Sequence, residues 1–126
     1  MEPKKSILII DDEIMLLDLL KKMLESKYDV GLVSSASEAL HFLNTNKVDC
    51  ILLDITMPNI NGFEFLYDIR KIPSYIVVPI IIVSGNTGQE FFNEARSSSA
   101  YAVLTKPVKK DILVETIEKA MTNKEL

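Results

Sequence analysis

Five short apolar runs alternate with segments of helical spacing along the chain, and this alternation restricts the fold more than any other feature of the sequence. The runs are residues 6–10, 29–33, 50–53, 77–83 and 100–104. Four of them are nearly continuous in Ile, Leu and Val, as strands covered on both faces are, whereas residues 29–33 alternate more and suit the edge of a sheet. Strands that alternate strictly with helices predict an α/β fold, in which helices cover both faces of a parallel sheet.

The segments between these runs predict five helices. Residues 35–38 and 87–90 both have the Ser/Thr-x-x-Glu pattern of a capping box, and we expect them to open the second and fourth helices. Apolar residues recur at helical spacing in the other three. These residues are Leu16, Leu19, Leu20, Met23 and Leu24 in the first helix, Phe63, Leu66 and Ile69 in the third, and Leu113, Ile117, Ala120 and Met121 in the last.

Length and composition exclude several classes of protein. The 126 residues suit one domain, residues 1–126, and 48% hydrophobic with 25% charged residues is typical of a soluble globular chain. A net charge of −4 argues against nucleic-acid or membrane-surface binding by the whole chain. Cys50, expected in the core, can form no internal disulfide, and with His41 as the one histidine it offers no zinc set. Because no apolar stretch approaches the ~20 residues of a membrane span and the chain does not open with a signal peptide, we expect a cytoplasmic protein.

Polar side chains with chemical potential follow four of the predicted strands. Asp11 and Asp12 follow the first strand, Asp54 ends the third, Ser84 ends the fourth and Lys106 follows the fifth. In doubly wound sheets ligands bind outside the carboxyl ends of the strands. The sequence therefore predicts that three carboxylates, a hydroxyl and an ammonium group meet at one edge of the sheet.

This set of groups favours a hard cation together with a phosphoryl group. Three carboxylates packed together repel one another, so at least one should have a raised pKa unless a cation neutralises them. Oxygen ligands without His or Cys select Mg²⁺ or Mn²⁺, and a lysine and a serine hydroxyl nearby suit an aspartyl phosphate. A nucleotide or flavin site is disfavoured because residues 10–13 are acidic where a glycine-rich phosphate cradle would be needed. A phosphatase of the haloacid-dehalogenase kind is disfavoured because Thr56 stands where a second Asp would be required.

These residues resemble the receiver domain of two-component response regulators, the family of the chemotaxis response regulator. The resemblance extends from about Lys5 to Met121 and rests on four motifs. It implies a flavodoxin-like, doubly wound, five-stranded parallel sheet of order 2-1-3-4-5 with five helices. The motifs are Asp11-Asp12, Asp54-x-x-Met57-Pro58-x-x-Asn61-Gly62, Ser84, and Lys106-Pro107.

The resemblance implies a role for each site residue. Asp54 is the expected phosphoacceptor, Lys106 pairs with Asp54 or its phosphoryl group, and the Ser84 hydroxyl moves to hydrogen-bond a phosphoryl oxygen. Mg²⁺ is the expected cofactor, with Mn²⁺ as a substitute. Its expected ligands are Asp11, Asp12, Asp54 and the main-chain carbonyl of Thr56. The domain would be a switch rather than an enzyme, apart from its own phosphorylation and slow autodephosphorylation.

Three features bear on how such a switch would work. The family usually has Tyr or Phe three residues before the lysine, where this chain has Val103, and Tyr101 on the same side of the strand is a candidate substitute. The peptide bond before Pro107 is commonly cis in the family. Residues that lie near enough to tune the lifetime of the phosphoryl group are Thr56, Asn59 and Asn86.

The expected partner is a histidine kinase or a histidine phosphotransfer protein. Ile14, Met15 and Leu17 lie off the apolar stripe of the first helix, and we expect Ile14 and Met15, with Pro107 and Val108, to form the docking surface. Ordinary exposed apolar area is the alternative for these residues. A homodimer through helix four, strand five and helix five is a further expectation from the family. The alternative function is a receiver-like interaction module that needs no phosphate, with no direct nucleic-acid or membrane binding in either case.

Overall fold

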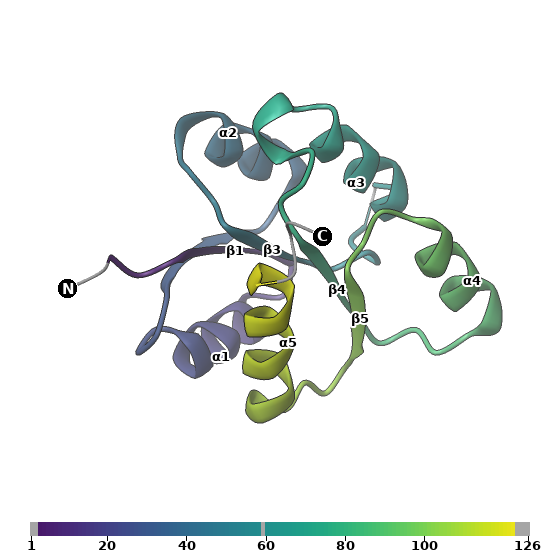
Figure 1. The fold of residues 1–126 in the computed structure, drawn as a ribbon. Helices are drawn as coiled ribbons and strands as arrows, with labels where there is room; N and C mark the ends of the chain where they lie inside the picture. The colour runs from purple at the N-terminus through teal and green to yellow at the C-terminus, as the bar shows by residue number, and fades with distance from the viewer. Residues whose placement is uncertain (1–2, 59, 123–126) are drawn as a thin grey trace.

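The computed structural model describes residues 3–58 and 60–122, so Asn59 lies outside the described residues. Its core is a five-stranded, all-parallel sheet of order β2-β1-β3-β4-β5, as Figure 1 shows. The predicted strand order is therefore confirmed. The strands are β1 (Ser6–Ile10), β2 (Asp29–Val33), β3 (Cys50–Leu53), β4 (Ile80–Ser84) and β5 (Ala102–Thr105).

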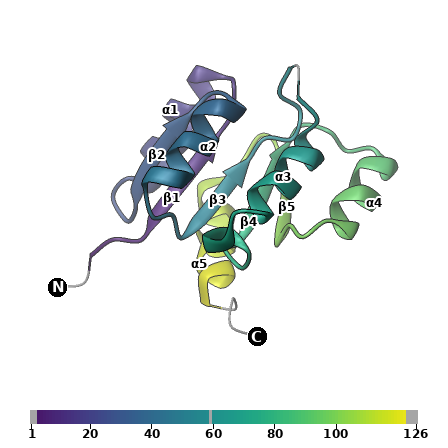
Figure 2. The ribbon, with the colours of Figure 1, turned by 90° about the horizontal axis from the view of Figure 1, so that it is seen from above.

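Helices cover both faces of the sheet. In Figure 1, α1 and α5 lie on one side of the strands and α2 and α3 on the other, and Figure 2 shows α2 and α3 in front of the sheet with α5 behind it. A short 3₁₀ helix, η1, precedes β4. The helices are α1 (Ile14–Leu24), α2 (Ala36–Thr45), α3 (Gly62–Arg70), η1 (Pro73–Tyr75), α4 (Gln89–Ser97) and α5 (Lys110–Thr122).

The alternating faces of the central strands build two apolar cores. Ile7 and Ile9 of β1 belong to the cluster under α1 and α5, whereas Leu8 and Ile10 belong to the cluster under α2, α3 and α4. Successive side chains of a strand point to opposite faces, so a continuous apolar run supplies both cores at once. All four residues of β3 are buried, including Cys50, as the sequence predicted.

The register of the strands positions the chain that follows them. Ile10 pairs with Leu53 across β1 and β3, and Leu53 pairs with Ile82 across β3 and β4. Ser84 pairs with Thr105 across β4 and β5. Because the strands are parallel and in this register, the residues directly after β1, β3 and β5 meet at one edge of the sheet.

The last two strands differ from the predicted runs. The run that starts at Val77 gives a strand only from Ile80, because Pro79 has no N–H for the ladder and Val77 is 68% exposed behind η1. β5 runs over Ala102–Thr105 rather than residues 100–104. The expectation that this run is covered on both faces is wrong: β5 is an edge strand, and its residues are half-buried or exposed.

The first helix packs on a stripe shifted from the predicted one. Leu17 is buried with Leu20 and Leu24, so placing Leu17 off the stripe was wrong, and Leu19 is 49% exposed. Leu16 and Met23 lie at the margin and pack partly against the core. The buried residues lie three and four positions apart, so the helix faces the sheet through one narrow row.

Of the two predicted capping boxes, only the first forms in part. The Ser35 hydroxyl accepts a hydrogen bond from the Glu38 N–H at 3.2 Å, but the Glu38 carboxylate accepts from the Ser34 N–H instead of returning to Ser35. The box at 87–90 is wrong, since α4 begins at Gln89 with Gly88 as its N-cap and no side-chain cap. His41 lies exposed on α2. Among the described residues, no helix is both long and apolar enough to span a membrane.

Candidate functional site

Three carboxylates gather where β1 and β3 end. Asp11 and Asp54 are 2% and 3% exposed, whereas Asp12 is exposed to solvent. Each of the three offers a carboxylate oxygen, and these oxygens lie within 4.8 Å of one another. The Asp54 N–H donates to the Ile10 carbonyl at 2.9 Å, which extends the β1–β3 ladder by one residue and seats Asp54 beside Asp11. The structure thus brings together the acidic cluster that the sequence predicted.

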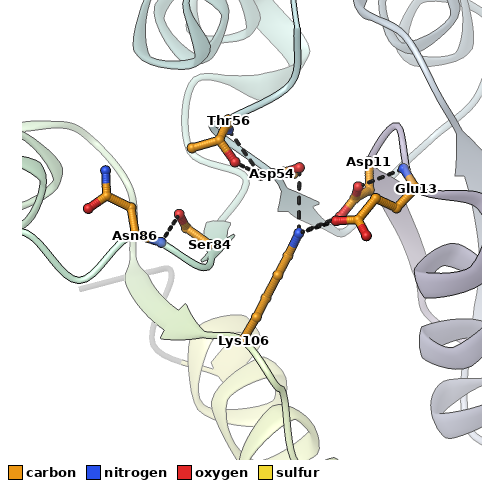
Figure 3. Close-up of polar contacts among 7 residues, drawn as sticks. All are labelled: Asp11, Glu13, Asp54, Thr56, Ser84, Asn86 and Lys106. Atoms are coloured by element: carbon orange, nitrogen blue, oxygen red, sulfur yellow. Dashed lines mark hydrogen bonds and ion pairs between the residues drawn. The ribbon is translucent and has the colours of Figure 1, made fainter.

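Lys106 directly follows the edge strand β5, and its ammonium group reaches into this cluster (Figure 3). Its Nζ lies 3.3 Å from Asp11 Oδ2 and 3.6 Å from Asp54 Oδ2. The Lys106 N–H donates to the Ser84 carbonyl at 2.9 Å, and the Lys106–Pro107 peptide bond is cis, as expected. The predicted meeting of an ammonium group with acids from two other strands is therefore confirmed.

Glu13 is a third partner of Lys106, and sequence reasoning gave it no role. Its Oε1 lies 3.2 Å from Lys106 Nζ, the shortest of the three contacts, and accepts a hydrogen bond. Its side chain is 63% exposed, in contrast to the buried Asp11. The signal available in the sequence was the third consecutive acid after β1, which looks like an ordinary first-turn acid of a helix.

Thr56 orients the Asp54 carboxylate. Its N–H and its hydroxyl both donate to Asp54 Oδ1, at 3.0 Å and 2.9 Å. The other oxygen, Oδ2, faces Lys106, as Figure 3 shows. The sequence assigned Thr56 a main-chain carbonyl ligand, which stays a prediction, and missed this orienting role of its hydroxyl.

The loop that carries Thr56 is fixed by a close backbone approach at the start of α3. Asn61 caps the helix, since its Oδ1 accepts from the N–H groups of Phe63 and Glu64. A Cβ on Gly62 would lie 2.3 Å from the Ile55 carbonyl oxygen, well inside contact distance. Glycine at this position therefore lets the chain fold tightly back beside the residue that follows Asp54.

Ser84 is fully buried at the end of β4. Its hydroxyl accepts from the Asn86 N–H at 3.0 Å, and Asn86 Oδ1 accepts in turn from the Gly88 N–H at 2.8 Å. These bonds lead the chain from β4 into α4 (Figure 3). A hydroxyl oxygen can still donate while accepting, so Ser84 retains a proton for a new acceptor.

Burial and crowding raise the pKa of Asp11. Loss of solvent around the carboxyl group is the largest cause and the charge of Asp54 adds to it, while the Glu13 N–H and the Lys106 ammonium act in the opposite direction. The net result raises the pKa of Asp11 from 3.8 to about 6. The direction agrees with the predicted raised pKa and the residue is Asp11, but burial rather than repulsion between the carboxylates is the largest cause.

Lys106 stays charged beside these acids. Burial alone would lower its pKa, but the charges of Asp54 and Asp11 and the hydrogen bonds to Glu13 and Asp11 outweigh burial. The pKa of Lys106 is consequently raised above its ordinary value. The site combines a fixed positive charge with an excess of negative charge, which suits a divalent cation and a group that is itself anionic.

Val103 and Tyr101 lie on the outer strand. Val103 is half-buried and packs against the cluster under α2, α3 and α4, whereas Tyr101 is 41% exposed. Both line a groove of about 260 Å³ between α4 and β5. The proposed substitution of Tyr101 for an aromatic switch residue stays a prediction.

The apolar residues expected to dock a partner lie beside the acidic cluster. Ile14 and Met15 are 61% and 87% exposed at the start of α1. Pro107 is exposed and Val108 half-buried at the approach to α5. The contact between Glu13 and Lys106 joins the two chain segments, because each residue directly precedes one part of this surface.

Comparisons with known proteins agree with this geometry. Residues 7–118 match the model of the response regulator receiver domain. The chain is 33% identical over 121 residues to the hydrogenase transcriptional regulatory protein HoxA of Cupriavidus necator, a match that covers 95% of this chain and 25% of HoxA. It is 33% identical over 116 residues to the transcriptional regulatory protein GlrR of Escherichia coli, covering 91% of this chain and 26% of GlrR. The chain thus spans about a quarter of the length of these curated relatives.

Solved structures show the same fold. A CheY-like response regulator receiver domain protein from Methanospirillum hungatei superposes with a TM-score of 0.88 at 30% identity, over 97% of each chain. The chemotaxis protein CheY4 of Vibrio cholerae superposes with a TM-score of 0.87 at 27% identity, over 93% of this chain and 98% of that one. The strand order, the acidic cluster with its lysine, and these matches lead to one conclusion: the chain belongs to the response regulator receiver domain family.

Proposed function

We propose that residues 1–126 form one receiver domain that accepts a phosphoryl group on Asp54 from a histidine kinase or a histidine phosphotransfer protein. The observation that carries this proposal is the setting of the Asp54 carboxylate. It is buried, it lies in a cluster with a second buried carboxylate, Asp11, and its Oδ2 is 3.6 Å from the ammonium group of Lys106. A carboxylate held next to fixed positive charge suits a nucleophile toward phosphorus.

The two oxygens of Asp54 have different tasks in this proposal. Oδ1 is engaged by the two Thr56 donors, which fixes the plane of the carboxylate. Oδ2 attacks phosphorus, and a new O–P bond forms while the bond from phosphorus to the donor breaks. The electron pair of the broken bond leaves with the histidine nitrogen of a protein donor, or with the acetate oxygen of acetyl phosphate. Lys106 offsets the negative charge on the transferring group. The Ser84 hydroxyl then turns to donate to a phosphoryl oxygen.

The acidic cluster fits Mg²⁺, with Mn²⁺ as a substitute. The donor set is oxygen only, and burial together with the charge of Asp54 raises the pKa of Asp11 even beside Lys106, so further positive charge would be favourable there. Asp11, Asp12, Asp54 and the Thr56 carbonyl would hold the ion. When bound, Mg²⁺ supplies positive charge that polarises the phosphoryl oxygens.

Phosphorylation would then shift a pre-existing equilibrium between two conformers. We place docking of the phosphodonor protein at Ile14, Met15, Pro107 and Val108, whose exposed apolar atoms adjoin the cluster. The changed surface would be that of α4, β5 and α5, which also offers a face for a homodimer. We propose a cytoplasmic protein with no direct contact to nucleic acid or membrane, and no enzymatic activity beyond its own phosphorylation and autodephosphorylation.

Incubation with acetyl phosphate and Mg²⁺ tests the proposal. The intact protein should gain the mass of one phosphoryl group, and the gain should vanish in Asp54→Asn and in the presence of EDTA. Circular dichroism of Asp54→Asn checks that the variant is folded. A wild-type protein that gains no mass would instead favour a receiver-like module that works without phosphate, for which Val103 at the usual aromatic position is the supporting feature.

A further inference from the structure

Lys106 is divided among three carboxylates, and the closest is not one of the groups proposed to react. Its Nζ lies 3.2 Å from Glu13, 3.3 Å from Asp11 and 3.6 Å from Asp54. An ammonium group has three protons to donate, so these three carboxylates already face all of its donors, and a fourth acceptor has to displace one of them. In the unphosphorylated protein Lys106 is thus held toward the β1 side of the site, nearer to Glu13 than to the proposed nucleophile.

The backbone of Glu13 is locked in place while its side chain is aimed at Lys106. Glu13 is the N-cap residue of α1, its N–H donates to Asp11 Oδ1 at 2.9 Å, and its carbonyl accepts from the Leu17 N–H at 3.0 Å. Its carboxylate makes no side-chain cap of the helix. Figure 3 shows it directed across the site to Lys106 instead.

We propose that Glu13 is a positioning residue that holds Lys106 in a resting place and competes with the phosphoryl group on Asp54 for its ammonium. This role rests on the proposed function. A phosphoryl group on Asp54 would add negative charge at Oδ2, the oxygen that now lies 3.6 Å from Lys106 Nζ. Lys106 must then give up a carboxylate contact in order to hydrogen-bond the phosphoryl oxygens.

Solvent exposure decides which contact is released. The Asp11 side chain is 2% exposed, so its carboxylate would be left buried without its cation. The Glu13 side chain is 63% exposed, so water replaces Lys106 when the pair breaks. Release of Glu13 is therefore the easier path, and the strength of this one pair sets how readily Lys106 moves to the phosphoryl group.

Two substitutions distinguish loss of the Glu13–Lys106 ion pair from loss of the negative charge of Glu13. Glu13→Gln removes the carboxylate, and Glu13→Asp keeps the charge but shortens the side chain by one methylene, so that it no longer reaches Lys106 and caps α1 instead. At saturating Mg²⁺, both should raise the rate constant of phosphorylation by acetyl phosphate about two- to fivefold, the range that an exposed ion pair supplies. The affinity for beryllofluoride, a stable phosphoryl analogue, should rise by the same factor. Glu64→Gln, an equal loss of charge at an exposed position of α3, should leave both unchanged.

Each outcome has a definite meaning. A rise in both Glu13 variants, with folding stability within error of wild type, supports the role. A rise in Glu13→Gln alone, or an equal rise in Glu64→Gln, assigns the effect to general repulsion of an anionic donor and overturns the competition for Lys106. A phosphorylated wild type with unchanged variants overturns the role of Glu13 only, whereas a wild type that gains no phosphate overturns the proposed function and this role together.

Discussion

Replacement of Asp11 by asparagine should stabilise the metal-free protein at neutral pH. Asp11 is the buried member of the acidic pair after β1, and its pKa is raised from 3.8 to about 6 by burial first and by the charge of Asp54 second. An amide of nearly the same shape keeps the Oδ1 that accepts the Glu13 N–H at 2.9 Å. The change therefore removes an unfavourable charge and preserves the turn into α1.

The sign and size of the stability change in Asp11→Asn follow from proton linkage. A carboxyl group whose pKa is raised in the folded state contributes its full stability below the unfolded value of 3.8 and loses it as pH rises through about 6. Each pKa unit corresponds to ~1.4 kcal/mol, so the rise from 3.8 to about 6 would cost the folded state at most about 3 kcal/mol above pH 6. Because water reaches Asp12 and Glu13 at the rim and screens the cluster, we expect about 1–2 kcal/mol, or about 4–8 °C in Tm for a chain of this length.

Urea unfolding in EDTA at pH values from 4 to 8 measures this difference. Wild-type stability should fall relative to Asp11→Asn between pH 4 and pH 6, and the gap should stay constant above pH 7. Asp12→Asn is the matched control, because it removes the neighbouring carboxylate at an exposed position and should change the free energy of unfolding by less than ~0.5 kcal/mol. Mg²⁺ at ten times its Kd should stabilise the wild type by about 1.4 kcal/mol and Asp11→Asn by less. A gap that is independent of pH, or an Asp11→Asn protein less stable than wild type at pH 7, would refute the reasoning.

Two further substitutions test the docking surface and the loop after β3. Met15→Arg, at a side chain 87% exposed, should slow phosphotransfer from a partner kinase at least about tenfold but leave labelling by acetyl phosphate unchanged; equal loss in both assays would remove Met15 from the docking surface. Gly62→Ala should lower the free energy of unfolding by about 2 kcal/mol or more, because the added Cβ would lie 2.3 Å from the Ile55 carbonyl oxygen. Gly85→Ala is the control in the same urea titration: its Cβ would have nothing within 4 Å, so the change should be less than ~0.5 kcal/mol.

The fold could be predicted from sequence because the central strands leave little choice. The residues of β1 after Ser6 and all of β3 are buried, and runs that are apolar on both faces have no stable place except the middle of a covered sheet. The predictions failed where an element is only half-covered. β5 lies at the edge of the sheet and its residues are only half-buried or exposed, so its apolar run does not fix its boundary. The eight apolar residues of α1 likewise allow more than one stripe.

The site could be predicted where topology decides and not where side-chain reach decides. Asp11, Asp54 and Lys106 meet because parallel strands end at one edge, which the alternation of elements already requires. The roles of Glu13 and of the Thr56 hydroxyl depend on rotamers and on which carboxylate oxygen faces which neighbour. Burial likewise separates Asp11 from Asp12, although the two are adjacent and identical in type.

The charge balance of the site links its stability to its proposed chemistry. Three carboxylates lie within 3.6 Å of a single ammonium group, so the metal-free cluster carries surplus negative charge. Burial first, and the charge of Asp54 after it, raise the pKa of Asp11. A phosphoryl group adds further negative charge, which one lysine cannot offset while Glu13 and Asp11 also hold it. A divalent cation relieves both costs, so binding of Mg²⁺ and of a phosphoryl analogue should each strengthen the other by the same factor. The crowding that weakens the empty fold is thus what couples the two ligands.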